Sequence, residues 1–161
     1  MKYFLIFMVI SVTVKGNLFD GNFVDDDDDE LDKQVQLISV DRLADFTKNN
    51  PGLELEMLQM SSGYRGQIYY TLGNRQRGDR LVATAANNQH WPRPQNAVVQ
   101  IGYPARGVGA LVTYVSVNVT QSSNLGQAYV TKGGINQRNI TIVVESYGTT
   151  FLNYVCNIFG I

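Results

Sequence analysis

The sequence predicts an all-β protein, an antiparallel sandwich or barrel of about seven strands with a short N-terminal helix and a flexible acidic lead. Short apolar segments recur from residue 67 onward, separated by clusters of turn-forming residues, which is typical of such folds. Hydrophobic residues make up 44% of the chain and charged residues 17%, so the chain can bury a core. Its 161 residues suit one domain of ordinary size.

The first 16 residues predict a secretory signal peptide. Lys2 precedes a 12-residue apolar run, residues 3–14, and Val14 and Gly16 stand where signal peptidase prefers small residues. The run is too short for a membrane span, which needs roughly 20 apolar residues. The alternative interpretation is a buried N-terminal strand, because the run is rich in β-forming residues. We expect a secreted protein that begins near Asn17 and has no membrane span.

Residues 17–32 predict the flexible acidic lead. Residues 25–30 are six consecutive acids of the 14 in the chain, and their mutual repulsion keeps such a segment extended. Consecutive aspartates point outward in turn and do not converge on one calcium ion, so we expect a solvated spacer. In a nuclear protein the run would suit an activation tail. The net charge of -1 gives no reason to expect nucleic-acid binding.

Residues 33–161 are predicted to form a single β-rich domain with the helix at its start. The helix is expected within residues 32–52, where apolar side chains fall near helical spacing before the stop signal NNPG: Leu37, Val40, Leu43, Ala44 and Phe46. Strands are expected at residues 67–72, 80–85, 96–103, 110–120, 127–132, 139–146 and 151–159. The double glycine of GGINQ, residues 133–137, predicts a hairpin turn with positive φ.

Two sequons of the N-x-[ST] type indicate N-glycosylation. Asn118 begins NVT and Asn139 begins NIT, each within a predicted strand. Side chains alternate between the faces of a strand, and in both segments the apolar residues occupy the opposite parity. Both asparagines are therefore expected to point away from the core, as a glycan requires. The alternative is two solvent-facing asparagines that are never modified.

The sequence offers little catalytic equipment, and we expect no enzyme activity, no cofactor and no metal site. His90 is the single histidine, so a histidine metal cluster cannot form, and no serine elbow accompanies it. We expect the neighbouring Trp91 ring to pack down while the imidazole stays in water. A hydrolase using His90 would need a serine or carboxylate within hydrogen-bond reach of the ring.

Two further motifs have an ordinary structural interpretation. The RGD tripeptide at residues 77–79 matches an integrin-type adhesion motif, but a turn before a strand uses glycine and aspartate for its own conformation. Cys156 is the single cysteine, so no disulfide can form within the chain. It shares a predicted strand face with Leu152, Tyr154 and Ile158, which predicts a buried thiol. An intermolecular disulfide is the alternative, which burial would exclude.

Three stretches carry a resemblance to a known family: GDRLVATA at residues 78–85, GALVTYVSVNV at residues 109–119, and GQAYVTKGGINQRNITIVVESYGTTFLNYVCNIFG at residues 126–160. Their ordered landmarks are GDRL, TYVSV, the double glycine, VVES followed by YG, and a closing IFG. From about residue 63 to residue 160 the chain resembles the insect family named after multiprotein bridging factor 2.

The resemblance implies a non-enzymatic protein without a cofactor. The family is named after a silk-moth coactivator that bridges a nuclear receptor and the general transcription machinery. Many members look like secreted proteins, and a lepidopteran branch is associated with the gut response to pathogens. We expect a secreted, glycosylated protein that binds an unidentified protein partner in gut or haemolymph defence. Exposed sheet edges would also allow a homo-oligomer. The alternative is a transcription coactivator.

Overall fold

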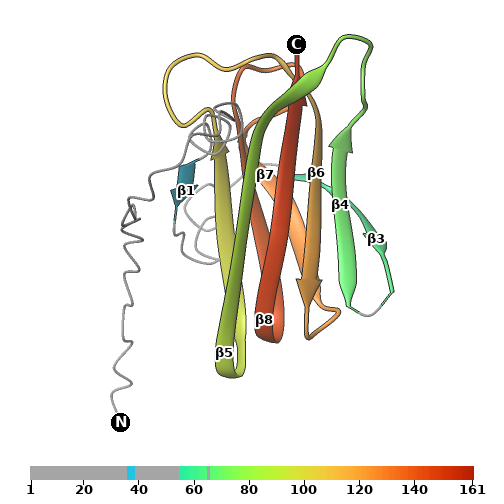
Figure 1. The fold of residues 1–161 in the computed structure, drawn as a ribbon, viewed down its shortest axis with the longest axis vertical. Helices are drawn as coiled ribbons and strands as arrows, with labels where there is room; N and C mark the ends of the chain where they lie inside the picture. The colour runs from blue at the N-terminus through green and yellow to red at the C-terminus, as the bar shows by residue number, and fades with distance from the viewer. Residues whose placement is uncertain (1–35, 39–54, 65) are drawn as a thin grey trace, which may run out of the picture.

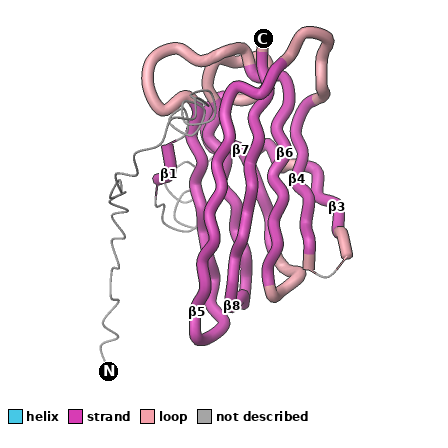
Figure 2. The backbone as a smooth tube through the Cα atoms, in the orientation of Figure 1, coloured by secondary structure: helices cyan, strands magenta, loops and turns pink. Residues whose placement is uncertain are grey.

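The computed structural model describes residues 36–38, 55–64 and 66–161 (Figure 2). The predicted signal peptide, the acidic lead and most of the predicted helix lie outside these residues. Of the expected helix, Gln36–Ile38 are described, and they form a β-strand instead. Within the described part of the chain every regular element is a strand.

The described residues form eight strands in one antiparallel sheet. The strands are β1 (Gln36–Ile38), β2 (Glu56–Met57), β3 (Gln59–Ser62), β4 (Gln67–Gly73), β5 (Arg80–Tyr103), β6 (Val112–Gln121), β7 (Gly126–Gly133) and β8 (Ile140–Gly160). The hydrogen-bonded order is β1-β5-β8-β6-β4-β3, and β7 pairs with both β8 and β2. The prediction of an all-β antiparallel fold is confirmed.

The two long strands, β5 and β8, bend so that each contributes to two layers. β8 pairs with β5 along its length but changes its other partner, from β7 for residues up to Ser146 to β6 for residues from Leu152 onward. Both strands turn at the lower end of the molecule in Figure 1: β5 descends in front and returns behind, whereas β8 descends behind and returns in front. The front layer therefore contains β3, β4, β6, the second half of β8 and the first half of β5. The remaining halves, with β1, β2 and β7, form the back layer.

The segment from β2 to β3 joins the two layers at their shared margin. β2 pairs with β7 of the back layer and β3 pairs with β4 of the front layer, and only Leu58 separates them. Leu58 is buried, and its backbone N–H donates to the carbonyl oxygen of Ala128 at 2.9 Å. Together with the bends in β5 and β8, this crossing nearly closes the sheet around one core.

Apolar side chains at alternate strand positions fill the space between the layers. Along β6, Val115, Val117 and Val119 are buried while the residues between them are partly or fully exposed. Burial of one such aliphatic side chain stabilises the fold by about 1.5–3 kcal/mol. The largest fully buried side chains include Tyr70, Tyr154, Ile68, Ile101, Ile140, Ile142, Leu152 and Ile158.

Two segments predicted as turns are instead bends inside continuous strands. Residues 87–96 lie within β5 and residues 147–150 lie within β8. The ladder shifts register between His90 and Gln95, where Pro92 and Pro94 lie, and Gly148 has a φ of 60°. Proline lacks an amide donor and glycine accepts positive φ, so both residue types suit a bend. The separate-strand prediction is wrong here because the two strands bend side by side without ending.

No strand is predicted before residue 67, yet β1, β2 and β3 all precede it. These strands are two to four residues long, and every side chain of β2 and β3 is exposed. An exposed edge strand lacks the alternation of apolar and polar residues by which strands are recognised. These three segments are strands because they pair with β5, β7 and β4, and their own sequences do not indicate it.

The double-glycine hairpin between β7 and β8 is confirmed. Gly133 has a φ of 69°, and a Cβ atom there would lie 2.0 Å from the carbonyl oxygen of Asn139. The Gly134 N–H donates to that same carbonyl at 3.1 Å. Any other residue at position 133 would both strain the backbone and clash, so glycine fixes this turn.

Candidate functional site

The first sequon asparagine, Asn118, lies near the centre of the outer surface of the front layer. It stands opposite Tyr69 of β4 on one side and Val155 of β8 on the other, and all three side chains are exposed. Its neighbours Val117 and Val119 point inward and are buried. The outward orientation expected from strand alternation is confirmed, and modification of the asparagine stays a prediction.

The side chains around Asn118 form an uncharged surface, which we call the front face. They come from matching rows of β3, β4, β6, β8 and β5, all of them described, and none carries a charge or is buried. The members are Gln59, Ser61, Gln67, Tyr69, Thr71, Thr84, Ala86, Asn88, Ser116, Asn118, Thr120, Asn153, Val155 and Asn157.

The second sequon asparagine, Asn139, lies at the foot of the β7–β8 hairpin. Its side chain is exposed, whereas the next residue, Ile140, is fully buried. The two sequons therefore occupy different parts of the molecule, one on a sheet and one beside a turn. Both are open to solvent.

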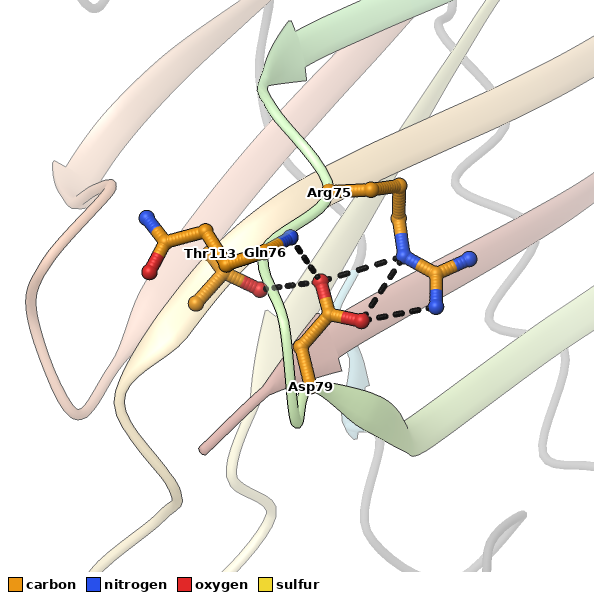
Figure 3. Close-up of polar contacts among 4 residues, drawn as sticks. All are labelled: Arg75, Gln76, Asp79 and Thr113. Carbon is orange, nitrogen blue, oxygen red and sulfur yellow. Dashed lines mark hydrogen bonds and ion pairs between the residues drawn. The ribbon is translucent and has the colours of Figure 1, made fainter.

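The RGD segment lies in the loop between β4 and β5, where its aspartate is turned inward (Figure 3). The Asp79 carboxylate accepts from the Arg75 guanidinium at 2.7 Å, from the Gln76 backbone N–H at 2.8 Å and from the Thr113 hydroxyl at 3.1 Å. Its side chain is only 1% exposed. Asp79 is therefore part of a locked loop and is not presented to a receptor, as the structural interpretation of this tripeptide predicts.

Electrostatics around Asp79 favour its charged form. The hydrogen bonds from the Arg75 side chain and the Gln76 amide lower the pKa of Asp79 from 3.8 to about 2. Arg75 also lies over the ring of Phe159, 3.8 Å from the ring centroid. The loop thus fastens the start of β5 to β6 and to the end of β8.

A second polar cluster lies on the outer surface of the back layer, around the buried carboxylate of Glu145. This side chain is 3% exposed. It accepts hydrogen bonds from Tyr129 Oη at 2.9 Å, from Gln127 Nε2 at 2.8 Å and from Tyr147 Oη. Gln127 Nε2 also donates to Tyr147 Oη at 2.9 Å. Three donors from β7 and β8 therefore hold the carboxylate in place.

Burial and the neighbouring carboxylate keep both tyrosines of this cluster protonated. Desolvation and the hydrogen bond to Glu145 raise the pKa of Tyr147 to about 12. The same causes raise the pKa of Tyr129 well above its ordinary value. The hydroxyls consequently remain protonated and donate to the Glu145 carboxylate at every physiological pH.

A third polar group closes the end of the sandwich where β8 bends. Ser146 Oγ donates to Gln121 Oε1, and Gln121 Nε2 donates to the carbonyl oxygen of Leu125 at 3.0 Å. Thr149 Oγ1 accepts from the Ser122 N–H at 3.2 Å. These contacts tie the β6–β7 turn to the bend of β8.

The single histidine and the single cysteine lie apart from these clusters. His90 is exposed and stacks on Phe151 with 5.8 Å between ring centroids, while Trp91 packs against the core. Cys156 is fully buried, and burial raises the pKa of its thiol to about 12. The buried-thiol prediction is confirmed, and burial excludes the intermolecular disulfide.

Among the described residues, no three histidine, cysteine, aspartate or glutamate side chains gather as metal ligands would. The same residues include no helix that is long and apolar enough to cross a membrane.

The protein is a bent antiparallel β-sandwich. Its polar clusters connect loops and strand bends to neighbouring strands. A protein-family model described as transcription activator MBF2 matches residues 72–160, which is more than half of the chain. The chain belongs to this family, as the sequence resemblance predicts. Comparison with curated proteins and with solved structures gave no match.

The matched region contains the landmarks of the resemblance, and the structure brings three of them together. Asp79 of GDRL bonds Thr113 of TYVSV, and Phe159 of IFG lies under the Arg75 guanidinium beside them. The VVES and YG landmark supplies Glu145 and Tyr147 to the cluster on the back layer. These landmark residues therefore connect strands that are distant in sequence. Their mutual contacts could not be read from the linear order.

Proposed function

We propose that this chain is a secreted, N-glycosylated, non-enzymatic binding protein of the MBF2 family that acts in gut or haemolymph defence. The observation that carries the proposal is a pair of exposed sequon asparagines, Asn118 and Asn139, in a chain with a signal-like amino terminus. N-glycans are added to secreted chains at solvent-facing sequons. Both asparagine side chains are exposed in the folded protein.

Further support comes from the way the polar side chains are used. Asp79 and Glu145 each accept several hydrogen bonds from neighbouring loops and strands. A general base or nucleophile must come within hydrogen-bond reach of its substrate, whereas these carboxylates already accept hydrogen bonds from neighbouring protein groups. The activity we propose is therefore recognition of a protein partner, without a cofactor, without nucleic acid and without a membrane span.

A second candidate is a transcription coactivator, favoured by the description of the family as a transcription activator. The acidic run at residues 25–30 would suit that role. It requires the chain to remain inside the cell with its first 16 residues in place.

Expression of the full-length chain in insect cells separates the two candidates. Culture medium and cell lysate are compared by intact mass, with and without N-glycosidase. We expect the protein in the medium, beginning near Asn17 and losing mass on treatment. Protein retained in the lysate with Met1 intact and no glycan would favour the coactivator.

A further inference from the structure

We propose that the glycan of Asn118 lies on the front face, with its first N-acetylglucosamine packed on the Tyr69 ring. The inference rests on the proposed function, because only a secreted chain meets the glycosylation machinery. It adds a defined sugar-binding surface on the protein itself. It also implies that protein partners use other surfaces of the molecule.

The position of Asn118 is the first argument. Asn118 is on a central strand of the front layer, with β4 on one side and β8 on the other. A sugar attached there has protein surface on both sides. Thr120, the third residue of the sequon, lies on the same face because strand side chains alternate.

The absence of charge among the front-face residues is the second argument; the next row along, Tyr114 and Phe159, lies beside the Arg75 guanidinium and bounds the front face. A soluble protein surface ordinarily carries charged side chains at about a quarter to a third of its positions. Every member of the front face is instead a hydroxyl, an amide, a tyrosine or a small apolar side chain. Hydroxyls and amides are suited to hydrogen-bond the neutral hydroxyl and acetamido groups of N-acetylglucosamine. Uncharged polar chemistry across five strands therefore matches a neutral sugar better than a charged partner.

The Tyr69 ring is the third argument. Tyr69 and Asn118 are direct cross-strand partners, which places their Cβ atoms about 5 Å apart. Tyr69 is 36% exposed, and its hydroxyl donates to Gln67 Oε1 at 3.0 Å. That bond makes the ring lean along β4 toward the row of Thr120, since Gln67 and Thr120 are cross-strand partners.

Gly63 supports the ring in this orientation. A Cβ atom at Gly63 would lie 2.7 Å from Tyr69 Cε2, so the ring occupies the space that a side chain would fill. The ring therefore lies on the β3 side of β4, and a sugar on Asn118 would cover it by reaching across β4. An aromatic ring offers an apolar surface to the C–H face of a pyranose while its hydroxyl remains bonded.

The test combines site occupancy with a double-mutant cycle on the secreted protein. Glycopeptide mass spectrometry of the full chain from insect cells measures the occupancy of Asn118 and Asn139. Thermal unfolding then compares the wild type with Asn118→Gln, each with and without Tyr69→Ala. We expect the Asn118 glycan to raise Tm by about 2–5 °C, and Tyr69→Ala to abolish that increment.

Tyr114→Ala is the matched control. Tyr114 lies on the same strand and the same face as Asn118, four residues away, which corresponds to about 13 Å along the strand. This substitution should change Tm equally with and without the glycan. Tyr69→Val provides a second variant with high strand propensity if Tyr69→Ala is not secreted.

Each outcome has a separate meaning. Full occupancy at Asn118 with coupling to Tyr69, and none to Tyr114, supports the inference. A secreted protein with an empty Asn118 overturns it and leaves the proposed function standing. So does an occupied Asn118 whose effect on Tm is unchanged in Tyr69→Ala. A protein retained in the lysate without glycan overturns both.

Discussion

The two halves of β8 differ in the solvent exposure of their outward side chains. In the front layer the outward Val155 is 38% exposed, and in the back layer the outward Val143 is 2% exposed. The burial pattern along the strand shows the same difference. Residues 152–158 alternate strictly between buried and non-buried positions, whereas residues 142–146 are buried without interruption. A strand with one solvent face alternates, and a strand buried on both faces does not, so one strand contains both situations.

The tyrosines show the same contrast. Tyr69 on the front layer bonds a glutamine and is exposed, whereas Tyr129 on the back layer bonds a buried carboxylate and is 2% exposed. The outer surface of the back layer is therefore buried around Tyr129, Val143 and Glu145. The front face is left open for modification or binding. Mutations at matched positions on the two surfaces should have unequal effects.

The largest difference is expected for the pair Tyr129→Phe and Tyr69→Phe. Tyr129→Phe removes a donor from the buried Glu145 carboxylate, and we expect a loss of about 1.5–3 kcal/mol in the free energy of unfolding. Tyr69→Phe removes an exposed bond to Gln67 and should cost less than about 0.5 kcal/mol. Urea unfolding of both variants measures the pair. Equal losses would contradict the distinction between the two surfaces.

The next pair tests packing without polar groups. Val143→Ala removes two methyl groups from a buried site, and we expect a loss of about 1–2 kcal/mol. Val155→Ala makes the same chemical change at an exposed site on the same strand and should stay within about 0.5 kcal/mol. Calorimetry on both variants gives the comparison. A large loss at Val155 would show that the front face is packed against something in the isolated protein.

The Asp79 loop predicts a stability that depends on pH. Its folded pKa of about 2 lies below its ordinary value of 3.8, so the charged form is favoured by folding. The stabilisation is present above about pH 4 and is lost as the pH falls toward 2. Asp79→Asn should therefore lower Tm at neutral pH, and the difference from wild type should shrink between about pH 4 and pH 2. A difference that stays constant down to pH 2 would contradict the ion pair with Arg75.

The smallest effect is expected for chemical modification of Cys156, whose thiol should not react in the native state. The thiol is fully buried and its pKa is raised to about 12, so maleimide should not react with it in the folded protein. Reaction in denaturant should be complete within minutes. Non-reducing electrophoresis should show no disulfide-linked dimer, and a dimer band from native protein would contradict the burial.

Much of the fold can be predicted from alternation and turn chemistry, and the failures have physical causes. Asn118 is exposed because its parity is opposite to that of its apolar neighbours in β6. Asn139 is predicted within a strand but lies one residue before β8, where residues 136–139 are all exposed, so parity does not account for its exposure. The same parity argument places Glu145 on the outward side, which is correct, but that side is buried at this position. Parity gives the face of a strand and says nothing about what covers it. The uninterrupted apolar run at residues 142–144 was the available signal.

The contacts between landmarks are the part that the sequence could not supply. Asp79 and Thr113 are separated by 34 positions, and Tyr129 and Glu145 by 16, so no local pattern relates them. The continuity of β5 and β8 is hidden for a related reason. The local sequence favours a strand end at Pro92, Pro94 and Gly148. The two strands nevertheless continue, because β5 and β8 bend together and remain paired on both sides of the bend.

Hydroxyl-radical footprinting of the secreted protein tests the difference between the two surfaces, and the place of the glycan, most directly. Oxidation of Tyr69 and Tyr129 is measured by mass spectrometry in the wild type and in Asn118→Gln. We predict that Tyr129 is protected in both proteins, while Tyr69 is protected in the wild type and becomes reactive when the glycan is absent. Equal reactivity of Tyr69 in the two proteins, or a reactive Tyr129 in the folded wild type, would contradict the account.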